Sequence, residues 1–187
     1  MKKHTQKIAQ ITVASLISTI IYIFTIGIVS MLLQSVAEDF MNASGILWIT
    51  SLLFVVVFSL SLINTLYRKN DNGEKIALED YKTGYIGVIN DIKLLFKREI
   101  NLLYYFLFIN GACWIITYID KLISAKKTFS AIFLIYYPLN CLSVVLPTWL
   151  NSVLAYALGS ILCYAIYLLT YALVRKKWHK KWTAKEK

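Results

Sequence analysis

The sequence has 187 residues, of which 58% are hydrophobic and only 16% are charged, and its formal net charge is +10. Soluble domains usually contain about 25% charged residues, so this composition excludes an ordinary soluble fold and indicates that lipid is the main solvent. The basic residues flank apolar blocks, where they set membrane topology and attract anionic headgroups. The charge therefore predicts contact with anionic lipids at the cytoplasmic face and no nucleic-acid binding.

The first apolar block, at about residues 8–33, follows the basic start Met1-Lys2-Lys3. A basic start before an apolar run also describes a signal peptide, and Ser35-Val36-Ala37 would serve as its cleavage site. The apolar region of a signal peptide is about 7–15 residues long, whereas this block is long enough to cross a bilayer. We therefore expect a retained first span, with cleavage as the alternative.

The second block, at about residues 46–66, ends in front of Tyr67-Arg68-Lys69 and is the second predicted span. A polar region follows it, and apolar residues recur there every three or four positions, at Leu78, Tyr81, Tyr85, Val88, Ile92 and Leu95. This period predicts an amphipathic helix at about residues 77–99. The helix either lies along the cytoplasmic membrane surface or packs on the chain's own spans, and the pattern favours neither.

Three further apolar blocks complete the chain. Those at about residues 102–119 and 149–174 are predicted spans, and a basic tail follows the last one. Between them, residues 129–147 are apolar but contain Pro138 and Asn140. Proline removes a helix hydrogen bond, and irregular backbone at membrane depth must be covered by protein or line a water-filled cavity. This segment is therefore predicted to be a re-entrant or interfacial helical hairpin on the outer side.

The distribution of Lys and Arg determines the predicted number of spans. With four spans, 17 of the 20 basic residues lie on the side of both termini, and the other side holds only Lys121, Lys126 and Lys127. A fifth span at residues 129–147 is the alternative, but it would separate the two basic termini, against the tendency of Lys and Arg to remain in the cytoplasm. The sequence thus predicts one all-α membrane domain at residues 1–187. It is a polytopic transmembrane helix bundle of the cell membrane, with four spans plus the hairpin and with cytoplasmic termini.

The predicted spans contain no Asp, Glu, His, Lys or Arg in their interiors. Proton-coupled transport and intramembrane proteolysis depend on such groups, and no glycine-rich phosphate loop is present. The two histidines, His4 and His179, lie in the basic terminal segments. We therefore expect no enzymatic activity, no catalytic residue, no metal site and no cofactor.

Small and uncharged polar residues are the remaining candidates for a site. Ala155, Gly159 and Cys163 repeat every four residues in the last predicted span, a spacing that lets a second helix approach closely. Amides in or beside the apolar blocks either cross-link helices by hydrogen bonds or line a polar site, and the candidates for such a lining are Asn110, Asn140 and Asn151.

The three cysteines, Cys113, Cys141 and Cys163, stand alone in apolar runs without a CxxC pair. Single cysteines in such surroundings are small packing residues. A disulfide between Cys113 and Cys141 is the alternative.

These features lead to a functional hypothesis with two alternatives. The hypothesis is a non-enzymatic accessory or partner-binding subunit of a membrane complex, with a membrane protein partner or a second copy of the chain. It rests on the missing catalytic groups and on the small-residue row. The first alternative is a solute-binding transporter component without its own ATPase, because broken segments such as residues 129–147 often line transporter sites. An immunity or peptide-resistance protein is the second alternative.

Overall fold

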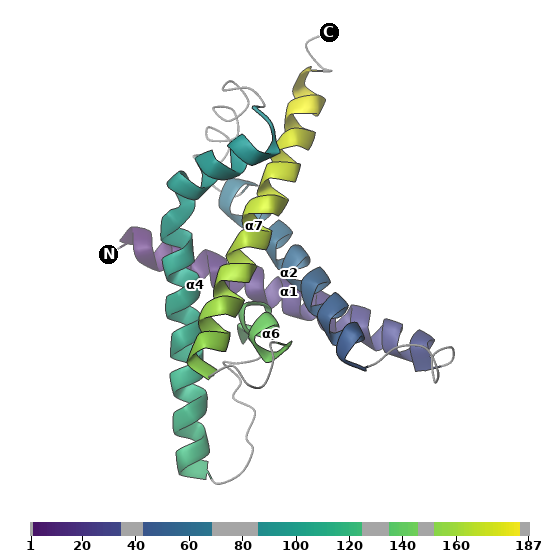
Figure 1. Ribbon diagram of the computed structural model, residues 1–187, viewed down its shortest axis with the longest axis vertical. Coiled ribbons are helices and arrows are strands. Elements are labelled where there is room, and N and C mark those ends of the chain that lie inside the picture. The colour runs from purple at the N-terminus through teal and green to yellow at the C-terminus, as the bar shows by residue number, and fades with distance from the viewer. Residues whose placement is uncertain (1, 35–42, 69–85, 125–134, 146–151, 184–187) are drawn as a thin grey trace.

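The computed structural model describes residues 2–34, 43–68, 86–124, 135–145 and 152–183. Within these ranges the chain is almost entirely helical and contains no strand. The helices follow one another as α1 (Lys2–Gln34), α2 (Ala43–Arg68), α4 (Val88–Ser124), α6 (Tyr137–Val145) and α7 (Ser152–Thr183) (Figure 1). The all-α fold predicted from the sequence is confirmed.

Four of these helices are long and apolar enough to cross a membrane. The candidate spans are His4–Thr25, Ile49–Leu66, Val88–Ile116 and Val153–Lys177. Large apolar side chains cover their outward faces, among them Ile20, Phe24, Leu53, Phe108 and Leu173. A helix forms its backbone hydrogen bonds internally, which is necessary in lipid because lipid offers no partners for backbone polar groups. Apolar side chains on the outward faces are likewise compatible with lipid. The predicted four-span bundle is confirmed.

The polar segment before the third span is part of the same helix as that span. α4 begins at Val88, directly after Gly87, whose φ of 104° is in the left-handed region that favours glycine. The amide of Asp91 then donates to the Gly87 carbonyl at 2.9 Å and closes the first turn. Figure 1 shows that α4 bends between its first turns and its long remainder. Residues 77–85 of the predicted amphipathic helix lie outside the described residues.

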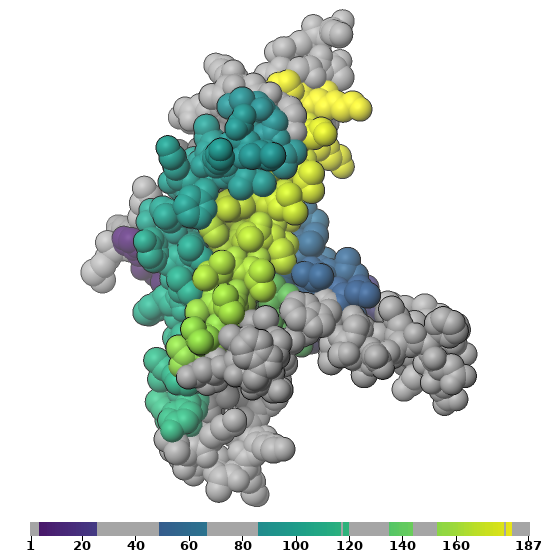
Figure 2. All heavy atoms as spheres, viewed as in Figure 1, coloured from purple at the N-terminus to yellow at the C-terminus, as the bar shows by residue number. Residues whose placement is uncertain are grey.

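The last helix continues beyond the predicted end of its span at residue 174. α7 extends to Thr183 and includes the basic stretch that begins at Arg175. Lys and Arg are good helix formers, and positive charge is favourable near a helix C-terminus. Figure 2 shows α7 lying against α4 over much of its visible length, and the α4–α7 contact is the most extensive between helices. This extension brings Arg175 of the tail into the bundle.

The short helix α6 is enclosed by the four long helices, each of which contacts it. Pro138 occupies its first turn, where a missing amide hydrogen costs no helix hydrogen bond. Ile135 is helical and Tyr136 forms a turn directly before α6, so the apolar block is interrupted next to Pro138, as predicted. Residues 139–142 of α6 are fully buried, as a re-entrant segment covered by protein requires. The rest of the predicted hairpin, residues 129–134, 146 and 147, lies outside the described residues.

Hydrogen bonds and aromatic contacts connect α1 and α2 to the start of α6. The Ser15 hydroxyl donates to the carbonyl of Ile135 at 2.6 Å, and the Thr12 and Tyr136 hydroxyls lie 2.8 Å apart. The rings of Tyr22 and Phe54 stack with their centroids 4.0 Å apart, and Tyr137 packs on both rings. Aromatic pairs of this kind add to the free energy of apolar burial.

The contact between α6 and α7 is closest at Gly159. A Cβ atom at this position would lie 2.1 Å from the Ser143 hydroxyl and 2.9 Å from the Ser143 backbone nitrogen. Such separations are far below van der Waals contact, so only glycine fits here without a shift of α6. Gly111 on α4 is the opposite case, because a Cβ atom there would meet nothing within 4 Å.

These distances predict that two matched substitutions differ in their effect on stability. Gly159→Ala overpacks the α6–α7 contact and should lower the unfolding free energy by about 1–3 kcal/mol. Adding Ser143→Ala should recover only part of the loss, because the backbone nitrogen still obstructs the new methyl group. Gly111→Ala is the control and should cost nothing. Unfolding of the three variants in bicelles measures these values, and a Gly159→Ala variant as stable as the parent would contradict the packing.

Candidate functional site

A buried ion pair joins the start of α4 to the last turns of α7. The Arg175 guanidinium donates from Nη1 to Oδ1 of Asp91 at 2.6 Å. The side chains of Asp91 and Arg175 are 0% and 4% exposed. Charges so far from water are costly, and each is tolerated only while the other is present. The pair therefore fixes the position of α4 relative to α7.

A second group of charged residues extends this contact to α1. The carboxylate of Glu99 lies 3.6 Å from the Lys7 amine and 3.5 Å from the Arg98 guanidinium. Arg98 also donates to the Tyr171 hydroxyl at 2.8 Å and lies over the Tyr171 ring. We call these residues the ion-pair cluster: Lys7, Asp91, Arg98, Glu99, Tyr171 and Arg175. It joins the beginnings of α1 and α4 to the end of α7.

The sequence interpretation missed the buried members of this cluster. Asp91 lies within the predicted amphipathic helix at residues 77–99 and Arg175 in the basic tail, and neither was predicted to be buried. One signal in the sequence could have indicated that the carboxylates of Asp91 and Glu99 are buried. From Asp91 to Ile109 of α4, buried positions recur every three or four residues, and the series contains both carboxylates: Asp91, Leu95, Glu99, Leu102, Phe106 and Ile109.

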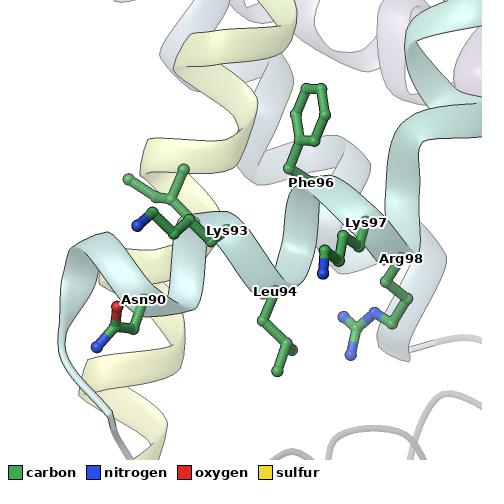
Figure 3. A pocket seen from close by; sticks show the side chains of 7 residues that line it. Asn90, Lys93, Leu94, Phe96, Lys97 and Arg98 are labelled. Carbon is green, nitrogen blue, oxygen red and sulfur yellow. The ribbon is translucent and has the colours of Figure 1, made fainter.

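The outward side of the first turns of α4 forms a shallow hollow of about 830 Å³. Figure 3 shows Leu94, Lys97 and Arg98 leaving the helix on one side and Phe96 on another. Lys93 and Lys97 are exposed beside large apolar side chains. This combination is typical of a helix at a membrane surface. One edge of this segment packs on α7, as the second predicted alternative requires, and its outer face combines exposed basic and apolar groups.

A second hollow, of about 720 Å³, lies between α1 and α4. Arg98 lines both hollows. The polar wall of the second one comes from His4, Lys7, Arg98 and Asn101, and its apolar wall comes from Ile8, Tyr104 and Phe108. The Nδ1 atom of His4 and the hydroxyl of Tyr105, which also lines the hollow, form a hydrogen bond. We call this feature the α1–α4 hollow.

Inside the bundle, Asn110 connects three helices. Its side-chain nitrogen lies 2.7 Å from the Ser160 hydroxyl, 3.1 Å from the Tyr156 carbonyl and 3.4 Å from the Leu139 carbonyl. Asn110 is 1% exposed, so these contacts replace the water that it lacks. They hold α4, α6 and α7 together at one point.

The candidate amides and the small-residue row meet around α6. Asn140 is buried within α6, and its side-chain nitrogen donates to the Tyr136 carbonyl at 3.0 Å. Asn140 directly follows Leu139, whose carbonyl accepts the hydrogen bond from Asn110. Asn151 lies outside the described residues. Ala155, Gly159 and Cys163 are all buried, and Gly159 faces Ser143 of α6. In the structure this row is therefore occupied by another helix of the same chain.

The cysteines Cys113, Cys141 and Cys163 are buried free thiols. The alternative of a disulfide between Cys113 and Cys141 is therefore wrong for this structure. In α6, burial raises the pKa of the Cys141 thiol to about 12. This thiol stays protonated at neutral pH, which fits a packing residue better than a nucleophile.

The fold and these contacts define the class of the protein, a multi-pass helical membrane protein with four candidate spans. Comparisons with family models, with curated proteins and with solved structures gave no match to the chain. Within residues 2–34, 43–68, 86–124, 135–145 and 152–183, no group of three or more His, Cys, Asp or Glu side chains is placed to hold a metal ion.

The buried ion pair predicts a strong and reciprocal mutational effect. Arg175→Gln leaves Asp91 buried without its main partner, which should cost about 3–5 kcal/mol of unfolding free energy. The exchange Asp91→Arg with Arg175→Asp should restore part of the loss, because opposite charges still face each other. Lys177→Gln removes an exposed charge from the same helix and serves as the control.

Unfolding of these variants in bicelles provides the measurement. Equal stability of Arg175→Gln and Lys177→Gln would show that the pair does not hold α4 to α7.

Proposed function

We propose that this chain is a non-enzymatic accessory subunit of the cell membrane that binds a membrane partner within the bilayer. The partner is another membrane protein or a second copy of the chain. The proposal rests on how the described residues use their polar groups. The polar groups of the ion-pair cluster and of Asn110 form contacts between helices of this chain. The surface that remains for recognition of a partner is therefore the outward surface of the bundle.

We also infer that both termini lie in the cytoplasm. The ion-pair cluster supports this orientation, because it brings basic residues of α1, α4 and α7 to one end of the bundle. Positive charge gathered at one end of a bundle is typical of the cytoplasmic side. The same charge would attract anionic lipids of that leaflet.

The observation that carries the partner-binding proposal is a stripe on the outward face of α4. Its large members are 53–68% exposed, and their spacing places them in one row together with Gly111: Tyr104, Phe108, Gly111, Ile115 and Tyr118. Glycine lowers helix propensity by about 1 kcal/mol relative to alanine, and no other part of the described chain fills the space beside Gly111. Close approach of a helix from another chain would account for this residue. The row Ala155, Gly159 and Cys163 cannot serve the same purpose while α6 covers it.

Photo-crosslinking in native membranes tests the partner. A benzophenone side chain at Phe108 or Ile115 should give a defined protein adduct, whereas the same group at Ile17 or Leu169, which are exposed on other helices, should not. Gly111→Leu fills the gap in the stripe and should reduce the Phe108 adduct at least tenfold. The mass of the adduct distinguishes a second copy from another protein. Adducts to lipid alone at all four positions would reject the proposal.

The alternative, a solute-binding component of a transporter, is favoured by a different observation. A hollow of about 170 Å³ lies between α4 and α7, where Asn110, Trp114, Tyr156 and Ser160 line it. The buried Asn110 Oδ1 atom has no hydrogen-bond partner among the described residues. A small solute with a donor group would satisfy this oxygen. Stabilisation of the protein by such a solute in a thermal-shift screen would support this function, and its absence across vitamins, nucleobases and amino acids would count against it.

A further inference from the structure

The gap beside Gly111 is part of the hollow of about 170 Å³ between α4 and α7. On the α7 side this hollow is lined by Tyr156, Ala157 and Ser160. A cavity of about 150 Å³ is large enough to hold benzene, so one side chain of moderate size fits into the hollow. Since a Cβ atom at Gly111 would meet nothing within 4 Å, a helix that passes closely over this glycine can insert a side chain there.

The hollow is also lined by Asn110, which is 1% exposed. The side-chain nitrogen of Asn110 lies 3.1 Å from the Tyr156 carbonyl and 3.4 Å from the Leu139 carbonyl. Carbonyl oxygens only accept hydrogen bonds, so these contacts fix which end of the amide is the nitrogen. The other end, Oδ1, is an acceptor without a partner among the described residues. A buried acceptor in this state is unfavourable, and a donor inserted from outside the chain would satisfy it.

A second copy of the chain that pairs through the same row on α4 does not supply this donor. Phe108 and Ile115, the members of the row nearest to Gly111, have no hydrogen-bond donor in their side chains. The two tyrosines of the row are seven residues away on either side, roughly 10 Å along the helix at ~1.5 Å per residue. Charge also disfavours this pairing. Lys93 and Lys97 are exposed near the start of α4, and a parallel copy would bring the same positive charges to that end.

We propose that the partner is a different membrane protein, one helix of which passes over Gly111 and inserts a side chain with a hydroxyl or amide donor into the hollow. This side chain donates a hydrogen bond to Oδ1 of Asn110. Such a bond distinguishes the partner from other apolar helices, because packing alone is similar for many of them. The inference rests on the proposed partner binding. It assigns to a protein side chain the hollow that the alternative function assigns to a solute.

Two synthetic transmembrane peptides test the hydrogen bond. Both are leucine-rich helices of about 20 residues, the length that crosses a bilayer, and they differ only at one central position. This position is threonine in one peptide and valine in the other, which have nearly the same shape, but only threonine has a donor. The full chain in bicelles carries a benzophenone side chain at Ile115, and the yield of peptide adduct is measured. The same group at Leu169, which is exposed on α7, gives the background.

The threonine peptide should give about five times the adduct yield of the valine peptide, as expected for one hydrogen bond between membrane helices. Asn110→Ala removes the acceptor and should make the two yields equal, even if the total yield changes. Gly111→Leu closes the hollow but keeps Asn110, and it should also abolish the preference, so the test does not depend on the folding of one variant. Lys177→Gln, at an exposed position on α7, is the control and should keep the preference of the parent.

Equal yields of the two peptides with the parent chain, or a preference for threonine that survives Gly111→Leu, would overturn the inference. Equal yields above the Leu169 background would still support binding of a membrane partner, so the two proposals can fail separately. In native membranes, an adduct at Ile115 that contains two copies of the chain would likewise remove this inference and leave the proposed function intact.

Discussion

The Asp91–Arg175 ion pair is the contact on which the arrangement of the bundle depends. Two charges lie 2.6 Å apart with almost no exposure to solvent, so neither can remain in place if the other moves away. Arg175 is available to α4 because α7 stays helical beyond residue 174, where the sequence-predicted span ends. Glu99 extends the same principle to Lys7, so α1, α4 and α7 meet through charged groups. Apolar packing in lipid is weakly directional, and these contacts supply the direction.

The interior of the bundle and its outward surface use their side chains differently. In the interior, Asn110 hydrogen-bonds to α6 and α7, and Gly159 lets α6 approach α7 until their backbones are in contact. On the outward surface, α4 carries basic groups near its start and exposed aromatic side chains farther along. The first region suits lipid headgroups and the second suits hydrocarbon or another helix. The proposed partner site lies at the outward face of α4, as this difference predicts.

Much of the fold could be predicted from the sequence, because apolar blocks long enough to cross a bilayer are a strong signal. Continuous helices across predicted boundaries were harder to foresee. The predicted amphipathic helix at residues 77–99 and the predicted span at residues 102–119 were separate elements, yet the backbone of α4 is continuous between them. Pro138 predicted an interruption of the apolar block, and the structure has one at Tyr136, directly before the helix whose first turn contains this proline. To predict that the carboxylates of Asp91 and Glu99 are buried, one must know which helices pack on α4. The spacing of apolar residues along the sequence does not provide this information. The small-residue row was recognised, but only the structure shows that α6 covers it.

The central claim is that the charged contacts hold the two basic terminal segments and the start of α4 at one end of the bundle, on one side of the membrane. Cysteine labelling on intact cells tests it directly, and the three native thiols are buried and give little background. An impermeant maleimide should label single cysteines placed at Ser44 and Ser124. A cysteine at Thr183 should react only after permeabilisation. Labelling of Thr183→Cys in intact cells would contradict the account, because Arg175 and the tail would then lie on the wrong side.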